Sequence, residues 1–312
     1  MLSKLRINTK INGIIRSIRT LKHLEKPKII NNINHQKVDY IRPLEVLNDK
    51  EKVNYELKET HLESIDSNYG LRTYMKDVYK YSGLGFGTTL VVGSTVPLII
   101  GAIPTLLPYA IPIWIGNVCF GFYSINKISK IRTLINTQKD KKGKEYYTEE
   151  IDSDKKLWYS LFSISNGITI SPALGAAMAL SPTILPTAII GTFGVFGGAT
   201  MYALNKKDFK AASWQAPLIG CVTGLIGASL VQIGFGLAGN HQIFHIMDMG
   251  ITGVSLLTFT GLVAADTQNA IKSYYDKTLD SINTSVELLL DATNILLDLI
   301  KVLSEIMKAT KD

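Results

Sequence analysis

The chain has 312 residues, a formal net charge of +7, a mean hydropathy of +0.16 and only 19% charged residues, which are strongly localised and exclude an ordinary soluble globule. Its lysines and arginines fall in loops without the basic and aromatic pattern of a nucleic-acid groove, so we predict no nucleic-acid partner. The two cysteines, Cys119 and Cys221, lie within apolar segments and indicate neither a disulfide framework nor a zinc site.

The N-terminal segment is basic, amphipathic and free of acids. Residues 1–22 carry six basic residues, with aliphatic residues threaded between them at roughly helical spacing. This pattern is typical of an organellar transit peptide, which we predict for residues 1–36. The alternative is a cationic arm that flanks the first span. Residues 37–80 mix both charge signs and are predicted to be a polar linker with some helix.

Residues 81–307 are predicted to form an all-α membrane domain of seven transmembrane helices, with a short tail at 308–312. Long runs without Asp, Glu, Lys or Arg hold roughly five helices, because about 20 apolar residues cross the hydrocarbon core. Two further candidates follow. The predicted spans are 82–103, 107–125, 157–180, 184–204, 211–238, 243–267 and 281–307. Prolines between the first two spans predict kinks and a tight reversal.

Loop charge predicts how these spans are oriented. With seven spans, the N-terminus and the loops 126–156, 205–210 and 268–280 lie on one side and hold nearly all lysines and arginines. The three loops on the opposite side hold essentially none. The positive-inside rule therefore turns the basic side toward cytosol or matrix.

The last predicted span carries acids within an aliphatic helix. Its apolar residues contribute about −5 kcal/mol to insertion, whereas its three acids together cost on the order of +8 kcal/mol. A lipid-facing helix is therefore excluded, and we predict a central helix with its acids turned inward. The polar residues form one stripe at i, i+4, i+7 and i+11: Glu287, Asp291, Asn294 and Asp298. The alternatives are a re-entrant segment and a soluble amphipathic tail helix.

Asp266 closes the preceding apolar stretch, GITGVSLLTFTGLVAAD. Two neighbouring carboxylates in a low-dielectric site share a proton, and raising the pH leaves a doubly negative site that suits calcium. We predict Asp266 and Asp291 as this ion and proton site, with auxiliary roles for Glu287, Asn294 and Asp298. Asp266 is expected at a helix end, whereas Asp291 is about ten residues (~15 Å) into its helix. The two residues are therefore expected at somewhat different depths in the membrane.

Each acid also has a purely structural interpretation. Asp266 could be a helix-end residue at the interface, and Glu287 could complement the dipole of a helix start. Asp298 could pair with Lys301 at i+3. Under these interpretations the acids hold the bundle together and bind nothing.

The remaining motifs give weaker signals. Asp248 lies about 27 Å along its helix from Asp266, so it is predicted at the opposite mouth, where it could pair with His245. The glycine-rich stretches at 82–87, 191–198 and 220–239 predict close helix packing. No nucleophile–base–acid set, HExxH or nucleotide motif occurs, so we expect no enzyme and no cofactor other than a bound or transported calcium ion.

Three stretches resemble the Bax-inhibitor family of membrane proteins, over roughly residues 72–307. They are SISNGITISPALGAAMALSPTILPTAIIGTFGVF, GLVAADTQNAI and VELLLDATNILLDLIKVL. The segment SWQAPLIG and the basic N-terminus are similar to the mitochondrial branch, the growth-hormone-inducible transmembrane proteins. The resemblance implies a seven-helix bundle with a central last helix. It also implies pH-dependent calcium leak or calcium/proton exchange that regulates ion homeostasis and cell death, in the mitochondrial inner membrane or, alternatively, the endoplasmic reticulum.

By motif, Asp266 and Asp291 correspond to the family's aspartate pair. Two positions depart from the family pattern: Ala265 stands where a bulky residue commonly precedes the first Asp, and Lys127 is the nearest match to a basic residue near the end of the second span. The implied partners are the lipid bilayer, calcium, protons and other membrane proteins. Because the mitochondrial branch is linked to cristae organisation, the second hypothesis is a non-transporting, anti-apoptotic interaction protein of the inner membrane.

Overall fold

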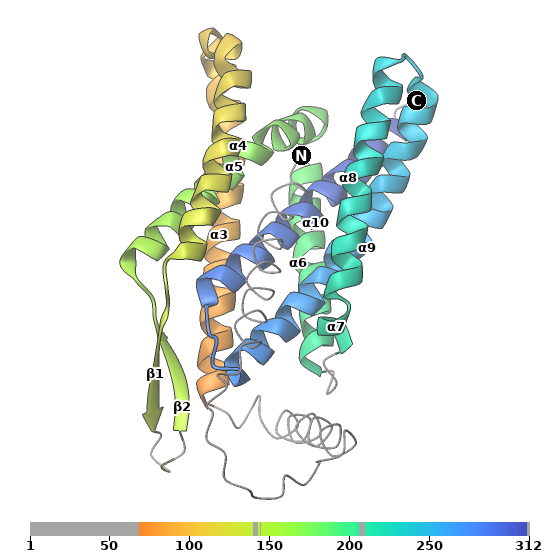
Figure 1. Ribbon diagram of the computed structural model, residues 1–312. Helices are drawn as coiled ribbons and strands as arrows, with labels where there is room; N and C mark the ends of the chain where they lie inside the picture. The colour runs from red at the N-terminus through yellow and green to blue at the C-terminus, as the bar shows by residue number, and fades with distance from the viewer. Residues whose placement is uncertain (1–68, 140–142, 144, 206–209, 311–312) are drawn as a thin grey trace, which may run out of the picture.

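The computed structural model describes residues 69–139, 143, 145–205 and 210–310. The predicted transit peptide, most of the predicted linker and the basic residues at 206–209 lie outside this part of the chain. The described residues contain seven long helices, a short 3-10 helix, a one-turn helix and a β-hairpin (Figure 1). In chain order these are α3 (Tyr69–Ala102), η1 (Pro104–Tyr109), α4 (Ala110–Lys130), β1 (Leu134–Lys139), β2 (Glu145–Glu150), α5 (Ser153–Leu180), α6 (Ile184–Asn205), α7 (Lys210–Ser213), α8 (Gln215–Leu237), α9 (His241–Tyr275) and α10 (Ser281–Ala309).

The outer faces of the bundle are apolar. Helices α3, α5, α6, α8 and α9 are long and apolar enough to cross a membrane. Large side chains point outward from them, and Ile190 and Leu257 are 73% and 74% exposed. Such surfaces are stable only against lipid or protein. The prediction of an all-α membrane protein with seven helices is confirmed.

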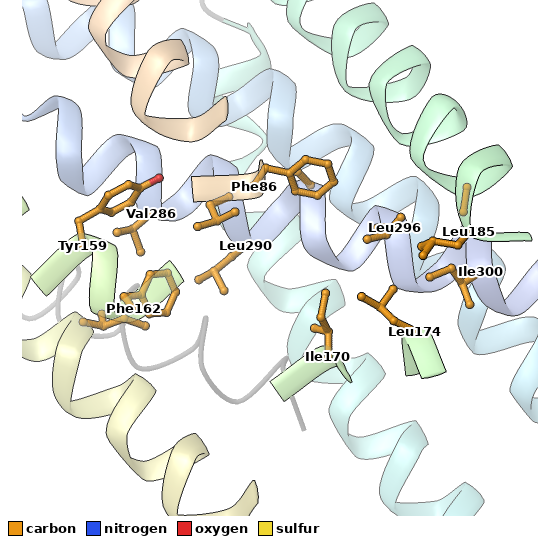
Figure 2. Close-up of a cluster of buried hydrophobic side chains, with 14 of the residues drawn as sticks. Phe86, Tyr159, Phe162, Ile170, Leu174, Leu185, Val286, Leu290, Leu296 and Ile300 are labelled. Atoms are coloured by element: carbon orange, nitrogen blue, oxygen red, sulfur yellow. The ribbon is translucent and has the colours of Figure 1, made fainter. Parts of the chain in front are cut away.

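Helix α10 lies at the centre of this bundle. It contacts α3, α4, α5, α6 and α9, and nine consecutive residues, 288–296, are buried. A helix that is buried all round cannot be a surface amphipathic tail, so the predicted central last helix is confirmed. Figure 2 shows part of the core that α10 forms with α3, α5 and α6, which includes Phe86, Tyr159, Phe162, Ile170, Leu174, Leu185, Val286, Leu290, Leu296 and Ile300.

Helix α3 begins earlier than the predicted first span. Residues 69–80 were expected in a polar linker, but they are helical and continuous with the span. Leu71, Tyr74 and Val78 recur at helical spacing and are almost fully buried, in a core shared with α9 and α10. The helix therefore continues through its charged residues because one of its faces is packed.

The segment 126–156 is not a simple charged loop. Helix α4 continues to Lys130, and the strands β1 and β2 form an antiparallel hairpin in which Asn136 faces Thr148. Helix α5 begins at Ser153, after Asp152 caps it by accepting the Asp154 amide at 2.9 Å. The hairpin extends beyond the end of the bundle in Figure 1.

Close glycine packing occurs between α3 and α5. A Cβ atom on Gly167 would lie 2.8 Å from the Thr89 carbonyl oxygen, and one on Gly85 would lie 2.9 Å from Leu289 of α10. In α8 the prediction of close packing holds at Gly236, where a Cβ atom would lie 3.1 Å from the Phe244 ring, and not at Gly220, Gly224 or Gly227, where it would meet nothing within 4 Å.

A buried ion pair fastens the hairpin side of α5 to the start of α10. The Lys155 side chain is completely buried, and its ammonium group donates to Asp280 Oδ2 at 2.6 Å. It also donates to the Ile131 carbonyl and the Thr133 hydroxyl, each at 3.0 Å, so all three of its hydrogens have acceptors. Asp280 in turn caps α10 by accepting the Asn283 amide at 3.1 Å. Two of the segments predicted on the basic side, 126–156 and 268–280, therefore meet at one end of the bundle.

Replacing Lys155 with methionine removes this ammonium group and leaves the Asp280 carboxylate without its partner. We expect the free energy of unfolding to fall by about 3 kcal/mol, the lower end of the range for a broken buried pair, because the Asp280 side chain is 26% exposed. Thermal unfolding in detergent micelles measures the change. The control is Lys156→Met, an exposed neighbour that we expect to change stability by less than ~0.5 kcal/mol. Equal stability of the two variants would contradict the assignment.

Candidate ion and proton site

Asp266 is fully buried on α9. The Gln215 side-chain amide, at the first residue of α8, donates to its Oδ1 at 3.4 Å. Two residues along, the buried Gln268 accepts the Ala212 amide at 3.0 Å and donates to the Ala203 carbonyl at 3.3 Å. The end of α6, α7 and the start of α8 therefore all contact this part of α9.

Asp266 does not lie at a helix end. The sixth span was predicted to end at residue 267, but α9 continues to Tyr275. Its last two turns are held by burial of Ala270, Ile271 and Tyr274, which pack in the core that α3 and α10 share. The hydropathy signal stops at Asp266 although the helix does not, so the interpretation of Asp266 as an interfacial helix-end residue is wrong.

With this extension the two aspartates lie at similar distances along their helices from the α9–α10 connection. Asp266 lies nine residues before the end of α9, and Asp291 lies ten residues after the start of α10. The two helices are in contact and run in opposite directions from a short connection (Figure 1). At 1.5 Å per residue both carboxylates are about 14–15 Å from that connection. The offset expected from the sequence assumed a helix that ends at residue 267, whereas α9 ends at Tyr275.

Asp291 is also fully buried, and two residues further along α10 Thr293 belongs to a buried polar network. Asn166 of α5 donates to the Thr293 hydroxyl at 2.9 Å and to the Thr89 hydroxyl at 3.4 Å. Thr89 donates to the Ser163 carbonyl at 3.0 Å. Helices α3, α5 and α10 are thus joined by hydrogen bonds two residues from Asp291, in the buried interior of the bundle.

The auxiliary residues on α10 differ in their surroundings. Glu287 is half-buried, while Asn294 is buried and donates to the Leu290 carbonyl at 2.8 Å on its own helix. Asp298 is partly buried, and its Oδ2 atom has no hydrogen-bond partner. The four polar residues therefore lie along one side of α10, but their side chains have different surroundings.

A second charged cluster lies toward the opposite end of α10. Lys301 forms an ion pair with Asp248 of α9, and Gln232 of α8 donates to the same Asp248 oxygen. The local pairing of Lys301 with Asp298 and that of Asp248 with His245 are therefore not formed. Sequence reasoning missed Gln232, although its signal was present: it is an amide in the middle of the charge-free run of α8.

Lys127, the nearest sequence match to the family's basic residue, lies away from the acids. Its ammonium group is over the Tyr123 ring, 5.4 Å from the ring centre. Within the described part of the chain, no three His, Cys, Asp or Glu side chains are grouped so as to hold a metal ion. A cation at Asp266 and Asp291 would complete its shell with amide, hydroxyl or water oxygens, as a transported ion does.

The fold and the buried acids define a polytopic helical membrane protein with a charged central helix. Residues 71–308 match the family described as inhibitor of apoptosis-promoting Bax1, and the chain belongs to this Bax inhibitor family. Bax inhibitor 1 of Bos taurus and of Homo sapiens are each 28% identical to the chain over 143 residues, and an uncharacterised protein of Helicobacter pylori has the same identity over the same length. These matches cover 46% of this chain and 57–58% of the relatives, so the chain spans little more than half of their length.

The proximity of the two aspartates can be tested by a disulfide. In a Cys119→Ser, Cys221→Ser background, we expect Asp266→Cys and Asp291→Cys to join on mild oxidation, because Cα atoms about 4.4–6.8 Å apart permit the bond. Gel mobility after thiol labelling measures the cross-link. Asp266→Cys with Asp298→Cys is the matched control, since Asp298 lies about 10 Å further along α10. Equal cross-linking of both pairs, or of neither, would show that the acids are not level.

Proposed function

We propose that this protein is a pH-dependent calcium leak channel or calcium/proton exchanger, with Asp266 and Asp291 as the proton sensor and ion site. One observation carries the proposal: two fully buried acids lie on adjacent helices of the bundle, each about nine or ten residues from the helix end that faces the α9–α10 connection. A carboxylate in a membrane helix costs roughly 2.5–3.5 kcal/mol on insertion scales, so it persists where a proton, a cation or a protein group compensates it.

The mechanism is a competition between protons and calcium. At low pH a shared proton neutralises part of the pair and leaves too little charge for a divalent ion. At higher pH both carboxylates are available, and two negative oxygen ligands supported by amides and water attract calcium. If the proton leaves to the side from which calcium arrives, the protein is a calcium/proton exchanger. If it does not, the protein is a calcium leak channel.

Two covers separate this site from the solutions. On the basic side, Gln215 and Gln268 belong to contacts between the α7–α8 segment and α9. On the opposite side, the ion pair between Lys301 and Asp248 lies between the site and the solution. We infer that an ion crosses only when these contacts rearrange.

Asp291→Asn keeps the shape of the side chain but removes its charge and its proton. In proteoliposomes we expect calcium flux to fall at least about tenfold, equivalent to ~1.4 kcal/mol, and its pH dependence to disappear. Flux across a pH series with a calcium dye measures both. The control is Glu305→Gln, which alters an acid near the end of α10 that pairs with Lys308. Unchanged flux and pH profile in Asp291→Asn would refute the mechanism.

A second candidate is a non-transporting, anti-apoptotic interaction protein that organises partners of the inner membrane. The hairpin favours it, because β1 is largely exposed and projects beyond the bundle (Figure 1). In this case wild-type proteoliposomes carry no calcium flux, and deletion of the hairpin abolishes the cellular function. A role in cell death is proposed under both candidates, since the relatives carry the name Bax inhibitor 1.

We propose the mitochondrial inner membrane as the location, with the endoplasmic reticulum as the alternative. The support is the basic, acid-free segment at the N-terminus. Deletion of residues 1–36 is expected to move a fluorescent fusion of the protein out of mitochondria. A fusion of residues 1–36 alone to a soluble reporter is the complement and should enter mitochondria. If deleting residues 1–36 leaves the location unchanged because the full-length protein and the variant are both in the endoplasmic reticulum, the alternative location is favoured.

A further inference from the structure

Helices α3 and α6 leave a crevice between them that reaches the central helix. Both pack on α10 (Figure 1), whereas within the described part of the chain they make at most slight contact with each other. A cavity of about 190 Å³ occupies this gap. Its floor is formed by Leu288 and Ala292 of α10, and its walls include Phe86 of α3 and Phe193 of α6. The crevice therefore lies where two helices of the bundle do not close on each other.

The crevice is apolar and opens toward the membrane. Phe86 and Phe193 meet edge to face with ring centres 5.7 Å apart, and Phe193 is 59% exposed on the outer surface. The hydroxyl groups of Ser82 and Thr192 in its lining donate to carbonyls of their own helices, each at 2.8 Å. A Cβ atom on Gly83 would meet nothing within 4 Å, so this wall residue leaves space open. Empty apolar space forfeits dispersion contacts, and a hydrocarbon chain from the bilayer restores them.

The end of the crevice toward the predicted basic side is polar. There the Tyr79 hydroxyl lies 3.4 Å from the Thr267 hydroxyl. Thr200, one turn beyond Phe196 on α6, lies beside Tyr79. Thr200 is only 9% exposed, and its buried hydroxyl has no partner at hydrogen-bond distance among the described residues. A buried hydroxyl without a partner is costly, and an ester carbonyl of a lipid can accept its hydrogen.

Positive charge continues along the face of α3 that lines the crevice. The residues of this face recur at i, i+4, i+7, i+11 and i+14: Arg72, Lys76, Tyr79, Gly83 and Phe86. Arg72 and Lys76 are exposed and lie two turns and one turn closer to the basic side than Tyr79. Exposed lysines and arginines beside a membrane attract the phosphate groups of acidic lipids. Along this face the surface thus changes from positive to hydroxyl-bearing to apolar, in the order of the head group, ester and chain of a phospholipid.

We propose that the crevice between α3 and α6 is a binding site for one acidic phospholipid. One acyl chain lies between Phe86 and Phe193 and reaches α10. An ester carbonyl accepts the Thr200 hydroxyl, and the phosphate lies at Lys76 and Arg72. The lipid then supplies the contact that α3 and α6 do not make with each other. The proposal does not rest on calcium transport, because it is tested by lipid retention and not by flux.

The experiment measures lipid retention by the full-length protein in native mass spectrometry. The protein, purified in detergent, is mixed with equal amounts of phosphatidylglycerol and phosphatidylcholine that carry the same chains. We expect one phosphatidylglycerol to be retained at least about fivefold more often than phosphatidylcholine, the preference that one basic residue beside the membrane gives. Glycerol 3-phosphate, which has the phosphate without the chains, should not displace it.

Two glycine variants test the crevice itself. Gly83→Leu places a side chain into the open space of the crevice, so we expect it to lose the retained lipid. Gly87→Leu is the matched control, because Gly87 lies one turn along α3, does not line the crevice, and has equally open space around its Cβ position. Added phosphatidylglycerol should raise the Tm of the wild type and of Gly87→Leu, but not that of Gly83→Leu.

Lys76→Gln leaves the crevice open and tests the charge. We expect it to reduce the preference for phosphatidylglycerol about fivefold while phosphatidylcholine is retained as in the wild type. Equal retention of the two lipids by the wild type, displacement by glycerol 3-phosphate, or equal retention by the two glycine variants would overturn the proposal.

Discussion

The rest of the structure depends on one constraint: a helix with acids in its middle cannot face lipid. Because Asp291 costs several kcal/mol in a bilayer, α10 takes the centre and other helices surround it on all sides. Their inner faces supply the aliphatic core of Figure 2 and the hydroxyl and amide groups of Asn166, Thr89 and Gln268. Their outer faces remain apolar toward the membrane. The central position of the last helix is thus a consequence of its charge.

The spans could be predicted from sequence because an apolar run of about 20 residues without charge is rare outside a membrane helix. Their ends could not. Helices α3 and α9 continue past charged residues, since Tyr74 at one end and Tyr274 at the other are buried against neighbours remote in sequence. The hairpin was missed for a similar reason: its strands are short, and they are held by contacts such as that of Glu149 with Ser281. Hydropathy detects contact with lipid, not packing beyond it.

The candidate site was predictable in its members and not in its geometry. Burial of Asp266 and Asp291 follows from the cost of exposing them to lipid, but their relative depth depends on where α9 ends. The choice of Lys301 between Asp298 and Asp248 is likewise a matter of neighbouring helices. Sequence spacing favours Asp298, which is on the same helix as Lys301. In the fold Lys301 pairs instead with Asp248 of α9, which also accepts a hydrogen bond from Gln232.

Helix α10 is fastened at both ends by an ion pair, and the two pairs are unequal. Lys155 is completely buried against the partly exposed Asp280 and has all its hydrogens accepted, so removing one partner leaves an uncompensated charge and costs about 3 kcal/mol. The Lys301 side chain is 37% exposed and Asp248 is 16% exposed, so water can replace part of that pair as it opens. A displacement of α10 therefore needs less free energy at the Lys301 end.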